Sequence, residues 1–205
     1  MSIKIHVEGG GGQDRINTLC RKGFSEYFAK IVPPNKNPRI VPSGSRRSAY
    51  DDFCTSIRTE RHKYELILLL VDSEDPVANN LTAWQHLKRR VADNWDKPQD
   101  AGDQSAHLMV QCMESWFLAD KDVLARYFGQ GFLRSSLPGQ ANVELIGKSD
   151  VLNALEHAVG PTTQRRYHKT NHGYELLGLI SPERVGQASQ RAQALHTLMA
   201  DQWFL

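Results

Sequence analysis

Acidic residues stand where three hydrophobic segments of this sequence end, and their carboxylates could bind a divalent cation. Glu8 follows a short β-branched run and precedes four glycines, a place that gives it no obvious structural task. Asp72 abruptly ends a six-residue apolar run, and Glu74 lies two positions later. Glu114 follows a third apolar segment, where it could equally be a solvated helix residue. Oxygen ligands of this kind suit Mg²⁺ or Mn²⁺, so the sequence predicts a metal site if these residues converge.

Alternating strands and helices are expected to position these residues. Apolar and β-branched runs predict strands, and apolar residues at helical spacing predict helices between them. The strands are expected at 3–7, 39–41, 64–71 and 107–112, and the helices at 14–31, 45–60, 77–95 and 116–128. This alternation predicts an α/β domain with a mostly parallel four-stranded sheet flanked by helices.

Parallel strands bring their carboxyl ends to one edge of a sheet, and neighbouring ends lie about 4.8 Å apart. Glu8, Asp72 and the residues after the fourth strand should therefore lie close together. Without Lys or Arg nearby, such carboxylates would repel one another unless a hard cation lay between them. Two acidic residues have a simpler interpretation: Asp75 would cap a helix whose first residue is Pro76, and Asp120 would cap or end another helix.

The C-terminal third is expected to be helical. Helices are predicted at 148–159 and 181–199, and Ser181 followed by Pro182 is a typical helix start. We therefore expect two parts, an α/β core at 1–130 and a helical extension at 131–205 that packs on it.

Composition limits the class of protein. The chain has 205 residues, of which 25 are Lys or Arg and 23 are Asp or Glu, and the net charge of +2 neither indicates nor excludes a nucleic-acid partner. Three cysteines without a CxxC pair form neither a disulfide framework nor a zinc motif. Because the sequence shows no signal peptide and no apolar run of about 20 residues, we expect a cytoplasmic protein without a membrane partner.

Four blocks of this sequence, in this order, resemble the Toprim domain of topoisomerases, primases and OLD-family nucleases. The likeness is greatest to a small stand-alone, RloB-like branch that is often found near bacterial defence genes. The blocks span most of the chain and read IHVEGG (5–10), LLLVDSED (68–75), MESWFLAD (113–120) and YHKTNHGYELL (167–177).

The resemblance implies a Toprim/Rossmann-like fold and a metal-dependent reaction at phosphodiester bonds. It assigns Glu8 as a general acid or base or a metal ligand, Asp72 as a catalytic metal ligand, and Lys169 as the group that stabilises charge on the phosphate. Glu74 stands where the family's DxD motif has its second Asp, and Glu reaches further than Asp. The metal ligands implied for Mg²⁺ or Mn²⁺ are Glu8, Asp72, Glu74, Glu114 and Asp120.

The same resemblance implies a nuclease that acts on DNA or RNA in anti-phage defence, with an ATPase protein as partner and a homo-oligomer as a further expectation. The sequence shows no tyrosine nucleophile and no primase zinc module, so hydrolysis is favoured over strand passage or synthesis. Two alternatives stay open. One is a non-catalytic regulatory or partner-binding subunit of an ATPase-containing complex, and the other is a nuclease directed at RNA such as tRNA.

Two further motifs have simpler interpretations. The glycines at 9–12 could hold a phosphate on backbone N–H groups, but a strand-to-helix turn is the plainer reading. Gly147-Lys148-Ser149 imitates the end of a P-loop, yet the earlier glycine and the preceding strand are missing, so we reject that motif. Basic doublets such as Arg46-Arg47 are usually solvated, although they could contact a nucleic-acid backbone.

Overall fold

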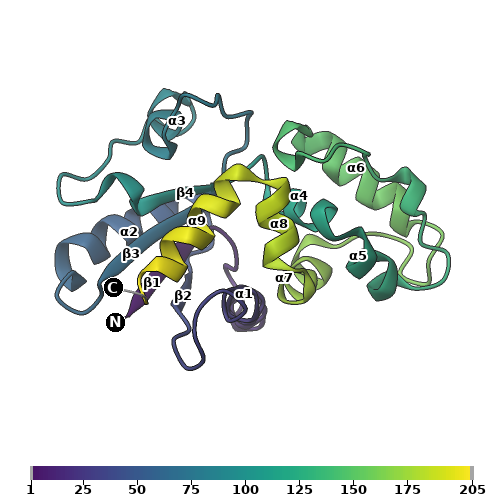
Figure 1. The fold of residues 1–205 in the computed structure, drawn as a ribbon, viewed down its shortest axis with the longest axis horizontal. Coiled ribbons are helices and arrows are strands. Elements are labelled where there is room, and N and C mark those ends of the chain that lie inside the picture. The colour runs from purple at the N-terminus through teal and green to yellow at the C-terminus, as the bar shows by residue number, and fades with distance from the viewer. Residues whose placement is uncertain (1, 204–205) are drawn as a thin grey trace.

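The computed structural model describes residues 2–203, and its centre is a four-stranded sheet (Figure 1). The strands are β1 (Ile3–Val7), β2 (Arg39–Pro42), β3 (Leu66–Asp72) and β4 (Ala106–Met109), in the order β2-β1-β3-β4. β1 pairs in parallel with β2 and β3, and β3 pairs in parallel with β4. The predicted α/β fold with a four-stranded sheet is confirmed, and every pairing in this sheet is parallel.

Helices cover both faces of the sheet because the central strands are apolar on both sides. Ile5 and Leu70 belong to a core shared with α1 and α7, whereas Leu69 and Val71 pack on the other face with Phe53 of α2. The helices are α1 (Asp14–Phe28), α2 (Arg46–Glu60), α3 (Ala83–Arg89), α4 (Met113–Phe117), α5 (Lys121–Phe128), α6 (Lys148–Val159), α7 (Tyr174–Leu179), α8 (Pro182–Ala188) and α9 (Gln190–Asp201).

The register places the acidic residues at one edge of the sheet. Val7 lies opposite Leu70, and Asp72 lies opposite Met109. Glu8 extends this ladder, because its N–H donates to the carbonyl of Leu70 at 3.1 Å. The carboxyl ends of β1, β3 and β4 therefore meet, as the sequence predicted.

The helix predicted at 77–95 is wrong over most of its length. Asp75 and Pro76 do not start a helix, and α3 begins only at Ala83, after a capping box formed by Thr82 and Gln85. The helix ends at Arg89, because Arg90 is already extended. Local capping therefore set the start of this helix, rather than the Asp-Pro signal.

Two other predicted helices are interrupted, and one strand is shorter than expected. The predicted helix 116–128 is divided between α4, a 3₁₀ turn at Leu118–Asp120 and α5, and the predicted helix 181–199 is broken at Ser189. The Ser189 side chain accepts a hydrogen bond from the N–H of Ala192 and so caps α9 as a new helix. Strand β4 ends at Met109 instead of residue 112.

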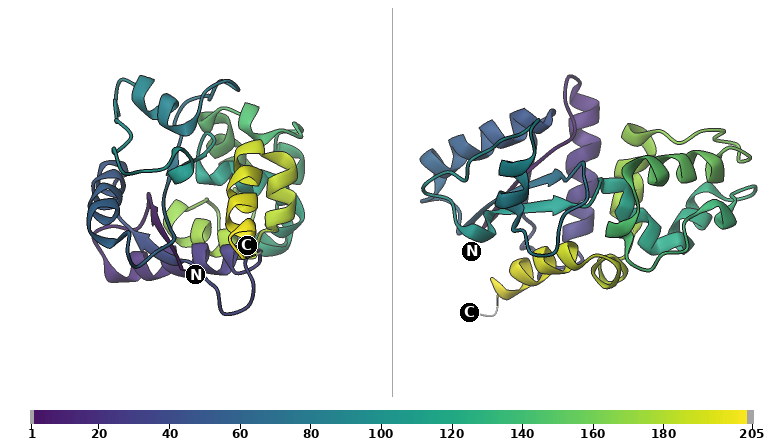
Figure 2. Two further views of the ribbon diagram at one scale, coloured as in Figure 1. Left: turned by 60° about the vertical axis from the view of Figure 1, so that its left-hand side comes forward. Right: turned by 90° about the horizontal axis from the view of Figure 1, so that it is seen from above.

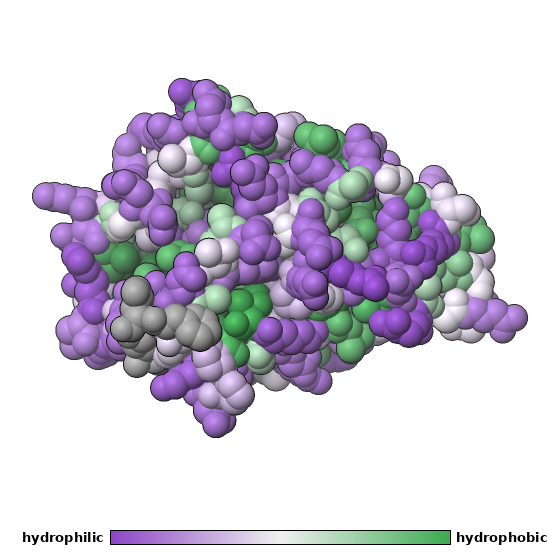
Figure 3. All heavy atoms as spheres, in the orientation of Figure 1, coloured by the Kyte–Doolittle hydropathy of each residue, from purple (hydrophilic) through white to green (hydrophobic). Residues whose placement is uncertain are grey.

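The C-terminal helices are distributed over the molecule. α5 and α6 lie beyond the end of the sheet, whereas α9 runs back alongside it (Figures 1 and 2). α9 contacts β4, and α7 packs on α1. The viewed face is largely hydrophilic, with small apolar groups between polar side chains (Figure 3). Among the described residues, no helix is both long and apolar enough to cross a membrane.

Candidate metal site at the sheet edge

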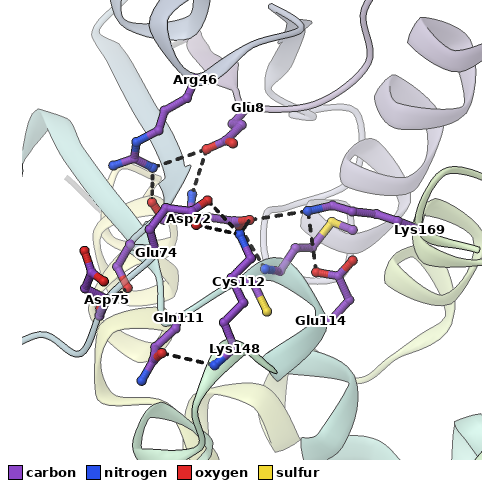
Figure 4. Close-up of polar contacts among 12 residues, drawn as sticks. Glu8, Arg46, Asp72, Glu74, Asp75, Gln111, Cys112, Glu114, Lys148 and Lys169 are labelled. Carbon is purple, nitrogen blue, oxygen red and sulfur yellow. Dashed lines mark hydrogen bonds and ion pairs between the residues drawn. The ribbon is translucent and has the colours of Figure 1, made fainter. Parts of the chain in front are cut away.

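Glu8 is held in place by two donors at the end of β1. Its Oε2 atom accepts a hydrogen bond from the N–H of Asp72 at 3.2 Å and lies 3.3 Å from Nη1 of Arg46. Arg46 is the first residue of α2, and it also donates to the carbonyl oxygen of Asp72 and pairs with Asp93 at 2.7 Å. Backbone and guanidinium contacts thus link the ends of β1 and β3 through one carboxylate (Figure 4).

Asp72 is the most deeply buried of the three carboxylates at the strand ends, Glu8, Asp72 and Glu74. The residue is 2% exposed, and its Oδ1 atom accepts a hydrogen bond from the N–H of Met113 at 2.8 Å. Its Oδ2 atom faces two ammonium groups, at 3.4 Å from Lys169 and 3.8 Å from Lys148. Burial raises the pKa of Asp72 to about 7, and Glu8 contributes to the rise while Lys169 opposes it. The carboxylate is therefore costly to keep charged and depends on its cationic neighbours.

Glu74 approaches from the turn after β3. The residue has a left-handed backbone with φ of 66°, a conformation that is uncommon outside glycine. Its N–H donates to the carbonyl oxygen of Gln111 at 2.9 Å, which holds that turn against the segment after β4. Both carboxylate oxygens lie 2.7 Å from Nζ of Lys148. The strained turn thus points the Glu74 carboxylate toward Lys148 and Asp72.

Three of the predicted ligands converge. One carboxylate oxygen each from Glu8, Asp72 and Glu74 lie within 4.8 Å of one another. An octahedral Mg²⁺ with oxygens at about 2.1 Å spans about 4.2 Å between opposite ligands, so small side-chain rotations would let the three groups share one ion. Oxygen donors are also the chemistry that Mg²⁺ and Mn²⁺ prefer. These residues therefore fit a divalent cation.

Glu114 lies beside this cluster on α4 and is fully buried, at 0% exposure. Its Oε1 atom accepts a hydrogen bond from the hydroxyl of Tyr167 at 3.3 Å. Its Oε2 atom accepts no hydrogen bond from any part of the chain that the structure describes, and Nζ of Lys169 lies 3.7 Å from it. A buried carboxylate oxygen with such weak compensation is expensive, and it lies beside the group that contacts Asp72.

Asp120 and Asp75 lie outside the cluster. The Asp120 carboxylate accepts a hydrogen bond from the N–H of Ser181 at 3.0 Å and another from Arg184 at 2.9 Å, so it ties the start of α8 to the turn after α4. Asp75 pairs with Arg90 at 2.6 Å and points away from the other carboxylates (Figure 4). Asp120 was predicted to lie with the other metal ligands, but its carboxylate instead contacts Ser181 and Arg184.

The condition under which a cation would be required, carboxylates without Lys or Arg nearby, is not met. Arg46, Lys148 and Lys169 all contact the acidic cluster, so repulsion among the carboxylates does not by itself require a metal. Lys169 lies in a π-helical turn, Lys169–Gly173, and neighbouring Asp72 and Glu114 hold its pKa above the ordinary value despite its burial. Lys169 therefore reaches the site that the resemblance assigned to it.

The sequence did not indicate that Lys148, Gln111 and Tyr167 belong to the site. Lys148 is the first residue of α6, and its N–H donates to the side-chain oxygen of Gln111 at 3.1 Å. The hydroxyl of Tyr167 donates a hydrogen bond to Glu114 and so holds that carboxylate beside the cluster. The only signal for Lys148 was the rejected Gly-Lys-Ser motif, and Arg46 was noted only as part of a basic doublet.

The glycine turn after Glu8 is already occupied by side chains. Gly9, Gly10, Gly11 and Gly12 all have positive φ, which explains why glycine is needed there. The N–H of Gly10 donates to the Tyr174 hydroxyl at 2.8 Å, and the N–H of Gly11 donates to Asn17 at 2.7 Å. These bonds favour the turn interpretation over a phosphate cradle.

A cavity of about 750 Å³ lies elsewhere, around the start of β3 and therefore at the opposite end of that strand from Asp72. Arg61 on its wall is paired with Asp100 at 3.6 Å. No group of carboxylates comparable to that at the sheet edge lines it, so we place the candidate site at the sheet edge.

The comparison with family models assigns the chain to a family. Residues 7–200 match the domain of unknown function DUF4276, and the chain belongs to that family. The match includes Glu8, Asp72, Glu74, Glu114 and Lys169, so the whole site lies inside the family domain. Neither the comparison with curated proteins nor the comparison with solved structures gives a match.

Proposed function

We propose that this protein is a divalent-metal-dependent nuclease that hydrolyses phosphodiester bonds in nucleic acid. The observation that carries the proposal is the convergence of Glu8, Asp72 and Glu74 at the carboxyl edge of a parallel sheet. Sites in open parallel sheets form at this edge. The order of the sequence blocks that resemble Toprim nucleases supports the same chemistry.

The three carboxylates would hold Mg²⁺ or Mn²⁺, and the buried Glu114 lies beside them as a further acidic group. When bound, such an ion would polarise a phosphoryl oxygen and supply a water of lowered pKa. The first task of the protein is to fix the ligands, and the donors to Glu8 and Asp72 from Arg46 and Met113 do so.

The remaining charged groups have roles that follow from their positions. Lys169 lies 3.4 Å from Asp72 and 3.7 Å from Glu114, and its side chain is 48% exposed, so it can meet a phosphate at the rim of the site. An ammonium in that place stabilises charge that develops on a phosphate in the transition state. Glu8 is less buried than Asp72 and can accept a proton from a nearby water.

Cleavage assays test this proposal directly. Purified protein is incubated with plasmid DNA, single-stranded DNA and bulk tRNA, each in EDTA, Mg²⁺ or Mn²⁺. We expect metal-dependent cleavage of at least one substrate, and a loss of at least about a hundredfold in Glu8→Gln, because metal binding and proton transfer both depend on this carboxylate. Glu183→Gln, an exposed carboxylate on α8, is the matched control and should keep wild-type activity. Equal cleavage by Glu8→Gln and wild type would contradict the assignment.

A regulatory subunit without catalysis is the second candidate, and a specific observation favours it. Lys148 and Lys169 balance part of the negative charge of Asp72 and Glu74 through ion pairs within the protein. Under this alternative the protein binds Mn²⁺ weakly or not at all and acts through a partner. An ATPase partner and a role in anti-phage defence rest on the sequence resemblance alone. Assembly into a homo-oligomer and an RNA substrate such as tRNA stay open alternatives.

A further inference from the structure

The ion pair between Lys148 and Glu74 has an unusual place in the site. Nζ of Lys148 lies 2.7 Å from both oxygens of Glu74 and 3.8 Å from Oδ2 of Asp72. Glu74 and Asp72 are two of the three residues whose oxygens converge. The ammonium therefore occupies the region between two of the proposed ligands (Figure 4).

Gln111 fixes both partners of this ion pair. Its side-chain oxygen accepts the N–H of Lys148 at 3.1 Å, and its backbone carbonyl accepts the N–H of Glu74 at 2.9 Å. Gln111 itself is 6% exposed. One buried residue thus holds the backbones of both Lys148 and Glu74 in place. The surface ion pairs of flexible lysines lack such support.

An ammonium that lies 2.7 Å from both oxygens of Glu74 uses lone pairs on each of them, and it repels a divalent cation placed beside the same carboxylate. We propose that Lys148 is an internal counter-cation that competes with the divalent ion for Glu74 and Asp72. This inference rests on the proposed metal-dependent function. Lys148 must give up at least one of its two contacts with Glu74 before that carboxylate can become a ligand, so the residue lowers the affinity of the site for metal.

A second observation shows that the site has unmet demand for positive charge. The Oε2 atom of fully buried Glu114 accepts no hydrogen bond from the described residues, and its cationic neighbour Lys169 is shared with Asp72. Lys148 and Lys169 thus serve three carboxylates between them in the absence of an ion. An added cation would relieve this shortage, which offsets part of the free energy that is lost when Lys148 gives up its contacts with the carboxylates.

Calorimetric titration with Mn²⁺ tests the competition, and it needs no assay of cleavage. Lys148→Met removes the competitor, and we expect it to bind Mn²⁺ about five- to thirtyfold more tightly than wild type, the equivalent of a partly buried ion pair worth about 1–2 kcal/mol. Lys148→Arg keeps the charge and can bind Glu74 through two N–H groups, so it should bind Mn²⁺ no more tightly than wild type.

Two controls separate competition from a general effect of charge. Lys169→Met removes an ammonium that contacts Asp72 but leaves Glu74 with Lys148, so its gain in affinity should be clearly smaller than that of Lys148→Met. Lys88→Met, at an exposed ion pair with Asp96, should not change the affinity. Circular dichroism checks that each variant is folded.

Equal affinities of Lys148→Met and wild type, or equal gains in Lys148→Met and Lys169→Met, would overturn the competition while leaving the nuclease proposal intact if the wild type cleaves. Failure of every variant to bind Mn²⁺ would refute both. Saturable binding by wild type, about five- to thirtyfold tighter binding by Lys148→Met and a clearly smaller gain in Lys169→Met would together support the competition.

Discussion

Replacing Asp120 by Ala tests whether this carboxylate stabilises the fold or binds metal. Asp120 is 3% exposed, and its Oδ2 atom accepts the N–H of Ser181 at 3.0 Å where α8 begins. A hydrogen bond to a charged acceptor is worth about 1.5–3 kcal/mol, and the variant leaves that N–H without its partner. The ion pair with Arg184 adds little because the Arg184 side chain is 48% exposed.

We therefore expect Asp120→Ala to lower the free energy of unfolding by about 2 kcal/mol. Urea denaturation followed by circular dichroism at 25 °C measures this loss as a lower midpoint at an unchanged slope. Asp122→Ala, which also contacts Arg184 but lies at the surface, is the matched control and should lose markedly less stability. The affinity of Asp120→Ala for Mn²⁺ should stay within about twofold of wild type, as expected for a site beyond the contact shell of this carboxylate.

Two results would refute this reasoning. A tenfold or greater loss of Mn²⁺ affinity in folded Asp120→Ala would return the residue to the metal site, as the sequence resemblance implied. An unchanged midpoint would show that the contact to Ser181 contributes nothing to stability.

Two further predictions concern the core and the glycine turn. His6 is 2% exposed, and burial lowers its pKa to about 4, so its stabilising effect is complete above the unfolded pKa of 6.5 and is lost as the pH falls toward 4. His6 should therefore lower the free energy of unfolding by about 2 kcal/mol between pH 7 and pH 5. Urea titrations at the two pH values should show a smaller fall for His6→Gln than for wild type. Equal falls in the two proteins would contradict the lowered pKa of His6. Gly10 has φ of 78°, and a Cβ there would lie 2.4 Å from Oδ1 of Asn17 and 2.8 Å from Cβ of Pro42. Gly10→Ala should lower the free energy of unfolding by about 2 kcal/mol or more. Gly139→Ala, where a Cβ meets nothing within 4 Å, is the control and should lower it only slightly. Similar urea midpoints for the two variants would show that the turn at Gly10 is not strained.

Periodicity predicted most of the sheet because burial on both faces leaves a strong signal. The run that ends at Asp72 is apolar throughout, and the structure buries β3 between α1 on one side and α2 on the other. The common edge of Glu8 and Asp72 follows from a parallel sheet in which β1 and β3 are neighbours, so this part of the site could be predicted. The position of the Glu74 carboxylate depends in addition on the left-handed turn after β3.

The remainder of the site depends on contacts between distant segments. Lys148 comes 74 positions after Glu74 in the sequence, and nothing local to either residue indicates that they meet. Asp120 was expected to be a ligand only from the sequence resemblance, and the 3₁₀ turn between α4 and α5 directs it to α8. The helix predicted at 77–95 fails for a local reason instead, because the capping box at Thr82 sets its start and Arg90 is already extended.

The most direct test of the central claim is the binding of Mn²⁺ to wild type and to Glu8→Gln, measured by calorimetry on the same preparations that are assayed for cleavage. Glu8 contributes one of the three convergent oxygens, and the isosteric amide keeps its size while removing its charge. We expect saturable binding to wild type, binding at least about tenfold weaker in Glu8→Gln, and a parallel loss of cleavage. Mn²⁺ affinity that is the same in both proteins would contradict a metal site at this sheet edge.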